Sequence, residues 1–373
     1  MLLQDIAELR HTLHQYPELS CREKRTVETL IQFLTAHTKL EIVPRDGWFY
    51  AVYRAGTAAK RPPIAFRADF DALPMEEGIS LPYASKNPGV AHKCGHDGHA
   101  AALAGFGCLL EELSPPRDVY LIFQHGEEIG AGGEACSRLI AEKQIGEVYA
   151  CHNWSGFPLG QILTREGTAQ CASQGLILSF RGSPAHASQP EDGRNPCKAL
   201  SLLALWLQEE AGWERQTADR PLLFATVVGM KAGGRNFGMS AALGELSVTL
   251  RGERQADMEA LKDTLIEKAK ELAALEGLTF TYEDVDVFPE TACDSEAVEK
   301  VRRAAASLRL DYQRLEKPIR ASEDFGYYLK QCPGAIFYIG NGTDYPEIHT
   351  REYDFPDGNL DTIIKMFSAL CMA

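Results

Sequence analysis

Apolar residues near the start of the chain recur with the spacing of amphipathic helices. The pattern covers residues 2–14 and 22–36, with Pro17 between them. Because proline cannot continue a helix interior, two separate helices are predicted.

Short apolar runs then alternate with longer stretches of helical periodicity. The runs that predict buried strands are PIAF (63–66), VYLIF (119–123), EVYA (147–150) and AIFYIG (335–340). The stretches that predict helices are 97–113, 131–143, 294–309 and 358–371. Strands that alternate with helices indicate an α/β domain with a mostly parallel central sheet between helices.

The middle of the chain has a different order of elements. The stretch QGLILSFRGSP (174–184) alternates between apolar and polar residues, as a half-buried strand does. The elements predicted after it are a helix (196–210), strands near 222–230 and 243–252, a helix (256–275) and a strand (278–284). This order is typical of a ferredoxin-like α+β domain. We therefore predict such a domain at 170–286, inserted into a first domain made of 1–169 and 287–373.

The overall charge limits the class of partner. The chain has 38 Lys and Arg against 52 Asp and Glu, a net charge of −14, which argues against nucleic acid or an anionic membrane. No apolar run reaches the ~18 residues of a membrane span, and Asp5 and Glu8 interrupt any signal peptide. The ten cysteines are scattered without a C-x-x-C pair, as expected for reduced thiols in the cytoplasm.

Side chains that can bind metal or move protons follow each predicted strand of the first domain. They are Asp69 and Asp71, Glu127 and Glu128, His152, and His349, joined by Cys94 and His96 of the stretch AHKCGHDGHA (91–100). In open α/β sheets, ligands bind beyond the carboxyl ends of the strands. We therefore expect one polar cluster at one edge of the sheet.

Carboxylates, imidazoles and a thiolate together suit a divalent cation such as zinc, manganese, cobalt or nickel. The candidates exceed one tetrahedral site, so two adjacent ions are predicted. Such a pair can activate water and polarise a carbonyl group. Glu127 and Glu128 should point in different directions, so that one binds metal while the other is free to act as general base.

Eight stretches occur together in one order along nearly the whole chain. They are LHQYPELS, RADFDALP, CGHDGHAAALAG, GEEIGAGG, CHNWSGFPLG, GSPAHASQPEDGRNP, ASEDFGYYL and IHTREYDFPD. With them the chain resembles the amidohydrolase subfamily of the aminoacylase/carboxypeptidase family of two-metal peptidases.

The resemblance implies a catalytic domain with an inserted lid domain, through which two subunits form a homodimer. It implies these metal ligands: Cys94, His96, Glu128, His152 and His349. Glu127 matches the general base, which activates water and then protonates the leaving amine. His186 matches a lid histidine that reaches the substrate, in related enzymes from the partner subunit, and Asn236 matches a lid asparagine that contacts the substrate.

The chain departs from the usual family motifs at three places. The usual Q-P-A-E-E has Gln124, His125 and Gly126 before the glutamates, and the usual H-A-C-G-H-D has Lys93 in place of alanine. After Asn236 the common V-I-P is replaced by Phe237, Gly238 and Met239. No ligand and no base is lost, but these positions lie near the expected substrate.

The remaining polar residues of the cluster are expected to support the site. Asp69 should orient a ligand or the water, with a salt bridge to Arg67 as the alternative. His99 is expected to support packing or a ligand and is not counted among the ligands. We expect Asp71 to be structural and Asp97 to cap the helix that begins there.

The leading hypothesis is a metal-dependent amidohydrolase that cleaves the amide bond of N-acyl amino acids. The alternatives within the same chemistry are an N-acetyl-diaminopimelate deacetylase and a metallo-dipeptidase or carboxypeptidase. A nucleophilic Cys94 with His96 or His99 as base is disfavoured, because the neighbouring carboxylates oppose a thiolate that has no cation beside it. A binding protein without catalysis is disfavoured because the base and every ligand are present.

Overall fold

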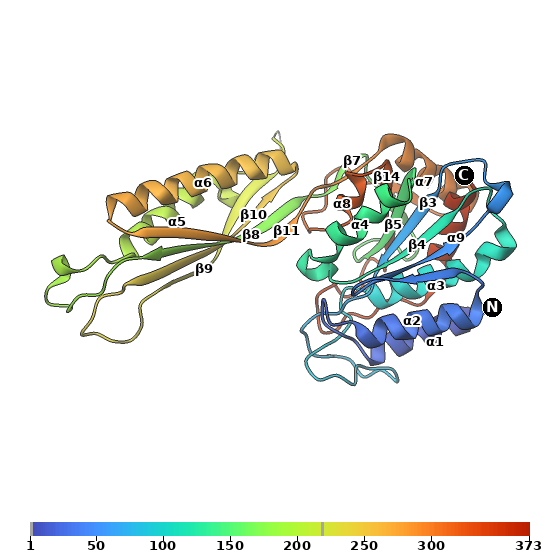
Figure 1. The fold of residues 1–373 in the computed structure, drawn as a ribbon, viewed down its shortest axis with the longest axis horizontal. Helices are drawn as coiled ribbons and strands as arrows, with labels where there is room; N and C mark the ends of the chain where they lie inside the picture. Colours follow the sequence, from blue (N-terminus) through green and yellow to red (C-terminus); the bar gives the residue numbers. More distant parts are fainter. Residues whose placement is uncertain (1–2, 218–219) are drawn as a thin grey trace. The chain divides into compact units, whose positions relative to one another are not determined.

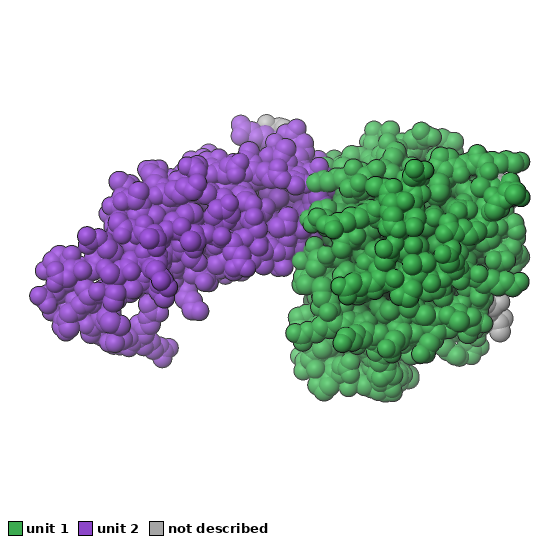
Figure 2. Space-filling model, viewed as in Figure 1, with its two compact units in different colours: residues 1–169, 291–318, 324–373 green, residues 170–290, 319–323 purple. Residues whose placement is uncertain are grey.

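The computed structural model describes residues 3–217 and 220–373, so residue 2 of the first predicted helix lies outside the described residues. The chain forms two compact units (Figure 2). Unit 1 comprises Met1–Ala169, Thr291–Pro318 and Asp324–Ala373, and unit 2 comprises Gln170–Glu290 and Ile319–Glu323. Unit 2 extends past the predicted end at residue 286 because its last strand continues to Phe288.

Unit 1 is built on an eight-stranded sheet with the order β1-β2-β4-β3-β5-β14-β6-β13. Its strands are β1 (Glu41–Pro44), β2 (Phe49–Tyr53), β3 (Ile64–Asp69), β4 (Val119–Gln124), β5 (Glu147–Trp154), β6 (Ile162–Thr164), β13 (Tyr312–Arg314) and β14 (Gly334–Gly340). The four strands predicted from apolar runs form the contiguous parallel centre β4-β3-β5-β14. Every residue of β3, β4 and β14 is buried, which is why these strands read as continuous apolar runs.

Helices cover this sheet (Figure 1). They are α1 (Leu3–Gln15), α2 (Lys24–His37), α3 (His96–Leu113), α4 (Gly132–Glu142), α7 (Ser295–Ser307), the short α8 (Gly326–Leu329) and α9 (Gly358–Met372). Helix α3 packs against α9, α1 and α2, whereas α4 packs with α8. The predicted α/β architecture is therefore confirmed. Among the described residues, no helix has the length and apolar character needed to cross a membrane.

Unit 2 has the predicted order of elements. They are β8 (Ala172–Arg181), α5 (Cys197–Ala211), β9 (Leu223–Ala232), β10 (Leu243–Gly252), α6 (Gln255–Leu275) and β11 (Thr279–Phe288). The strands form an antiparallel sheet with the order β11-β8-β10-β9. Alternate residues of β8 and β10, such as Leu178 and Val248, join α5 and α6 in one apolar core. The ferredoxin-like prediction is confirmed.

A buried cluster of charges joins α1 to α3 and to the loop that precedes α9. Arg10 Nη1 donates to Asp97 Oδ2 (3.2 Å) and Asp354 Oδ1 (2.8 Å). His14 Nδ1 lies 2.8 Å from the same Asp97 oxygen, and its Nε2 lies 2.9 Å from Glu77 Oε2. Burial opposes the charged imidazole, but Asp97 and Glu77 outweigh it and raise the pKa of His14 to about 9. The cluster is therefore held together by a protonated histidine.

Replacing His14 with glutamine should make the stability of unit 1 less sensitive to alkaline pH. Because the pKa of His14 is higher in the folded state, protonation of His14 stabilises that state. This stabilisation is fully present below the ordinary pKa of 6.5 and is lost as the pH rises through about 9. The difference in unfolding free energy between wild type and His14→Gln should therefore shrink by about 3 kcal/mol across that window. Urea denaturation at several pH values measures it. The control is His37→Gln, which removes an exposed imidazole of α2; an unchanged difference would contradict the prediction.

Candidate metal centre

The predicted cluster residues of unit 1 meet at the carboxyl edge of the parallel strands. Asp69 ends β3, Glu127 and Glu128 lie in a short 3₁₀ turn (Glu127–Ile129) just after β4, and His152 lies in β5. Cys94 lies in the loop just before α3, His96 is the first residue of α3, and His349 lies in the loop between β14 and α9. Gly95 allows this approach, since its φ is +105° and a Cβ there would lie 2.3 Å from Asn153 Oδ1.

The five predicted ligands form two groups that share the sulfur of Cys94. Donor atoms of Cys94, His96 and His152 lie within 4.8 Å of one another, and so do those of Cys94, Glu128 and His349. Cys94 Sγ lies 3.5 Å from His152 Nε2 and 3.3 Å from His349 Nε2. The Nε2 atom of His349 is also 3.4 Å from Glu128 Oε1. Bonds of zinc to nitrogen and sulfur imply donor separations of about 3.3–3.8 Å in a tetrahedral site, which these distances match.

Hydrogen bonds to the other ring nitrogen orient both buried histidines of the cluster. His96 Nδ1 donates to Asp71 Oδ1 (3.1 Å), and His152 Nδ1 donates to the carbonyl of Asn153 (2.8 Å). In both rings Nε2 is left to face the other donors. Ligand histidines are held in this way in metal sites, because the second nitrogen fixes the tautomer and the ring direction.

Asp71 has a larger part in this arrangement than the structural role expected from the sequence. Besides His96, it accepts hydrogen bonds from the backbone N of Glu128 (3.0 Å) and from Ser20 Oγ (2.7 Å). It therefore contacts two of the five candidate ligands. Its spacing of two residues from Asp69 was the available signal, since alternate residues at a strand end point to the same side.

Asp69 and His99 lie in a hydrogen-bonded chain around the candidate ligands. Asp69 accepts from Arg67 Nη1 (2.5 Å), which is the salt bridge weighed as the alternative, and from His99 Nδ1 (2.6 Å). Its orientation of a ligand or of the water stays a prediction. His99 Nε2 lies 2.6 Å from Asn153 Oδ1. Both ring nitrogens of His99 are therefore occupied, which fits a supporting residue better than a ligand.

The electrostatics of the cluster favour a bound cation. Burial raises the pKa of the Cys94 thiol, and the carboxylates of Glu128 and Glu127 raise it further. Burial opposes a charge on His96, but Asp69 and Asp71 raise its pKa to about 10. Among the described residues, His96 Nε2 and Glu128 Oε1 are buried without a hydrogen-bond partner, 3.8 Å apart. A divalent cation among these atoms would satisfy both and stabilise the thiolate, so the residues present fit a metal.

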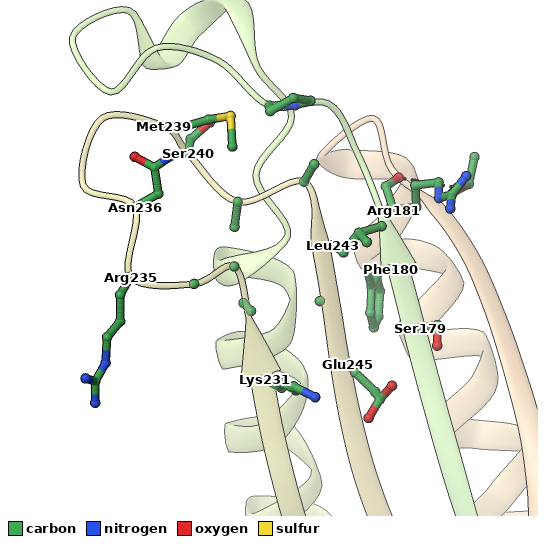
Figure 3. A pocket seen from close by; sticks show the side chains of 18 of the residues that line it. Ser179, Phe180, Arg181, Lys231, Arg235, Asn236, Met239, Ser240, Leu243 and Glu245 are labelled. Atoms are coloured by element: carbon green, nitrogen blue, oxygen red, sulfur yellow. Dashed lines mark hydrogen bonds between the residues drawn. The ribbon is translucent and has the colours of Figure 1, made fainter.

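The two predicted substrate contacts lie in unit 2, outside this cluster. His186 is exposed, and its Nδ1 is hydrogen-bonded to Ser188 Oγ (2.7 Å). Asn236 is exposed on the loop after β9, where its Oδ1 accepts from Gly238 N (3.1 Å). The two loops pair through a bridge between His186 and Met239. Asn236 is among the residues that line a pocket of about 1010 Å³ in unit 2. Figure 3 shows its side chain on the loop.

Comparison with known proteins identifies the family. The sequence matches Peptidase family M20/M25/M40 over residues 65–373. It is 28% identical over 350 residues to an N-acetyldiaminopimelate deacetylase of Shouchella clausii (92% of each chain). It is 31% identical over 357 residues to an N-acetyl-L-cysteine deacetylase of Bacillus subtilis (93% of this chain and 83% of that one).

A solved structure has the same fold. It is a dinuclear metal binding peptidase of the M20 family from Bacillus subtilis, with a TM-score of 0.81 and 24% identity, covering 99% of this chain and 97% of that chain. The fold, the sequence match and the two deacetylases agree with the predicted resemblance. The chain belongs to Peptidase family M20/M25/M40 and is a hydrolase of amide bonds.

Proposed function

We propose that the protein is a two-metal amidohydrolase that cleaves N-acyl amino acids into a carboxylate and a free amino acid. The observation that carries the proposal is the sharing of Cys94 by two donor groups, with Glu127 beside them. The names of the relatives support it, since two of them remove the acetyl group from an N-acetyl amino acid. The solved relative that binds two metals supports a dinuclear site.

The residues divide between two ions. Cys94, His96 and His152 would hold one, and Cys94, Glu128 and His349 would hold the other. When bound, such ions polarise the amide carbonyl and lower the pKa of water. Zinc, manganese, cobalt and nickel all suit this mixture of sulfur, nitrogen and oxygen donors.

Glu127 is the proposed general base. It is 5% exposed, and its Oε2 lies 3.9 Å from His96 Nε2, so its carboxylate faces the space where water and substrate would meet. In this role Glu127 accepts a proton from the attacking water. It then gives the proton to the amine nitrogen as the amide bond breaks.

Unit 2 is the proposed lid and dimerisation domain of a cytoplasmic homodimer. Strand β9 lies at one end of its sheet order, so one of its edges pairs with no strand among the residues that the structure describes. Such an edge can pair with a second copy. His186 and Asn236 are exposed on paired loops of the same unit, which suits contact with a substrate bound by another subunit.

N-acetyl-diaminopimelate is the second candidate substrate, favoured by the Shouchella clausii relative.

A cysteine-nucleophile enzyme is disfavoured by the raised pKa of the Cys94 thiol, because a thiol that stays protonated is a poor nucleophile.

Replacing Glu127 with glutamine should abolish turnover and leave metal binding intact. Loss of a general base typically costs about 10²–10⁴-fold in rate, and the amide cannot accept the proton. Hydrolysis of a panel of N-acetyl amino acids, including N-acetyl-diaminopimelate, measures the rate, and atomic emission measures the metal content. The matched control is Glu134→Gln on the exposed surface of α4. A Glu127→Gln protein with near wild-type turnover would refute the mechanism.

Replacing Asp71 with asparagine should weaken metal binding by about 10–100-fold, as loss of a residue that orients a ligand usually does. The amide cannot accept from His96 Nδ1, Ser20 and the Glu128 backbone as the carboxylate does. Titration with zinc under competition from a chelator measures the affinity. Asp118→Asn, at a partly buried carboxylate that bonds Arg54, is the control. Equal zinc affinity in Asp71→Asn and wild type would show that Asp71 has no part in the site.

A further inference from the structure

Lys93 is a fully buried lysine next to the shared ligand Cys94. An ammonium group without water needs charged or polar partners, because burying it unpaired is costly. Its Nζ forms an ion pair with Glu77 and donates to the carbonyl of Tyr353 (2.7 Å). Its own carbonyl accepts from the backbone N of His349 (2.6 Å). One residue therefore contacts the loop of His349 through both its main chain and its side chain.

The loop that carries His349 is held locally by turn hydrogen bonds, such as the one from Tyr353 N to the carbonyl of Thr350 (3.2 Å). Residues 341–357, between β14 and α9, contain no helix and no strand. His349 itself has φ of +62°, an uncommon conformation for a residue with a side chain. Its side chain is 48% exposed, in contrast to the other four candidate ligands. The position of its Nε2, 3.3 Å from Cys94 Sγ, must therefore depend on contacts made by the backbone around it.

Three contacts hold this backbone at alternate residues. The carbonyl of Lys93 binds the N–H of His349, the N–H of Gly78 donates to the carbonyl of Arg351 (3.0 Å), and Lys93 Nζ binds the carbonyl of Tyr353. Gly78 follows Glu77, the ion-pair partner of Lys93. Lys93 and the segment 77–78, which its ion pair joins, therefore hold the loop at residues 349, 351 and 353.

We propose that Lys93 is a positioning residue that holds His349 beside Cys94. Its ion pair with Glu77 allows the buried ammonium group to bind the carbonyl of Tyr353. The inference rests on the proposed function, in which His349 is a metal ligand. It also gives a physical role to one of the departures from the usual family motif. An alanine at this position, as in that motif, is too short to reach the carbonyl of Tyr353 and has no side-chain donor.

Glu77 supplies the charge that lets the ammonium remain buried. It lies between two cationic partners, since its Oε2 also accepts from His14 Nε2 (2.9 Å). Burial opposes ionisation of Glu77, but His14 and Lys93 lower its pKa to about 2. Lys93 therefore connects the candidate ligands to the cluster of buried charges around His14, which joins α1 to α3.

The test is the Lys93→Met variant, which keeps the length of the side chain but removes its charge and its donors. Equilibrium dialysis against zinc, with metal counted per subunit, should show two ions in the wild type. In Lys93→Met, one ion should bind about 10–100-fold more weakly while the other is unchanged. His349→Ala should reproduce this loss, and Lys86→Met, at an exposed lysine that bonds Gln15 and Tyr16, should not. The loss should appear in kcat more than in KM, since substrate contacts are not removed.

A double variant separates positioning from simple stability. Glu77→Gln with Lys93→Met removes both charges of the buried pair, while His14 keeps its other partner, Asp97. The weak second site should persist, because the donor to Tyr353 is still missing. If either folded variant binds both ions as tightly as the wild type, the inference is overturned and the proposed function stands. If the wild type binds no zinc, manganese, cobalt or nickel, both are overturned.

Discussion

The concentration of buried negative charge at one edge of the parallel sheet is the constraint on which unit 1 depends. Asp69, Asp71, Glu127 and Glu128 lie there beside the Cys94 thiol, largely or fully removed from water. Burial on this scale is unfavourable unless cations compensate it. Protonated histidines can do so in part, and a divalent cation among the candidate ligands would do so further and would stabilise the Cys94 thiolate. The positions of the cationic groups around these carboxylates therefore shape the site.

Arginine and histidine extend this compensation outward from the cluster. Arg67 connects Asp69 to Asp324 (2.7 Å), and Asp324 also accepts from the backbone of Gly133 in α4 (2.7 Å). On the other side, Arg10 and His14 neutralise Asp97 at the start of α3. Helices distant in the chain are thus joined by the same charges that surround the candidate ligands. Stability and metal affinity should be coupled in this protein for that reason.

Much of the candidate site could be predicted from the sequence because many of its residues lie at or just after the ends of strands. Uninterrupted apolar runs mark central parallel strands, and the residues just after such runs must gather at one sheet edge. This reasoning, with the family motifs, pointed to Cys94, His96, Glu128, His152 and His349, which the structure brings together. The functions of Asp71 and Lys93 were not predictable in the same way. The two-residue spacing from Asp69 indicates only the side to which Asp71 points. The partners of Asp71 and Lys93 lie 16 to 260 residues away, and no local pattern identifies them.

The sequence alone determined the two architectures, the order of their elements and the identity of the candidate ligands. Hydrophobic periodicity and the residue types just after an apolar run are local properties of the chain, so the sequence contains them. Contacts between distant segments were needed to show that Cys94 is common to both donor groups, that Asp71 bonds His96, and that the buried Lys93 bonds the loop of His349. The reason is physical: distances between side chains, and the cost of burying their charges, exist only once distant segments have packed together.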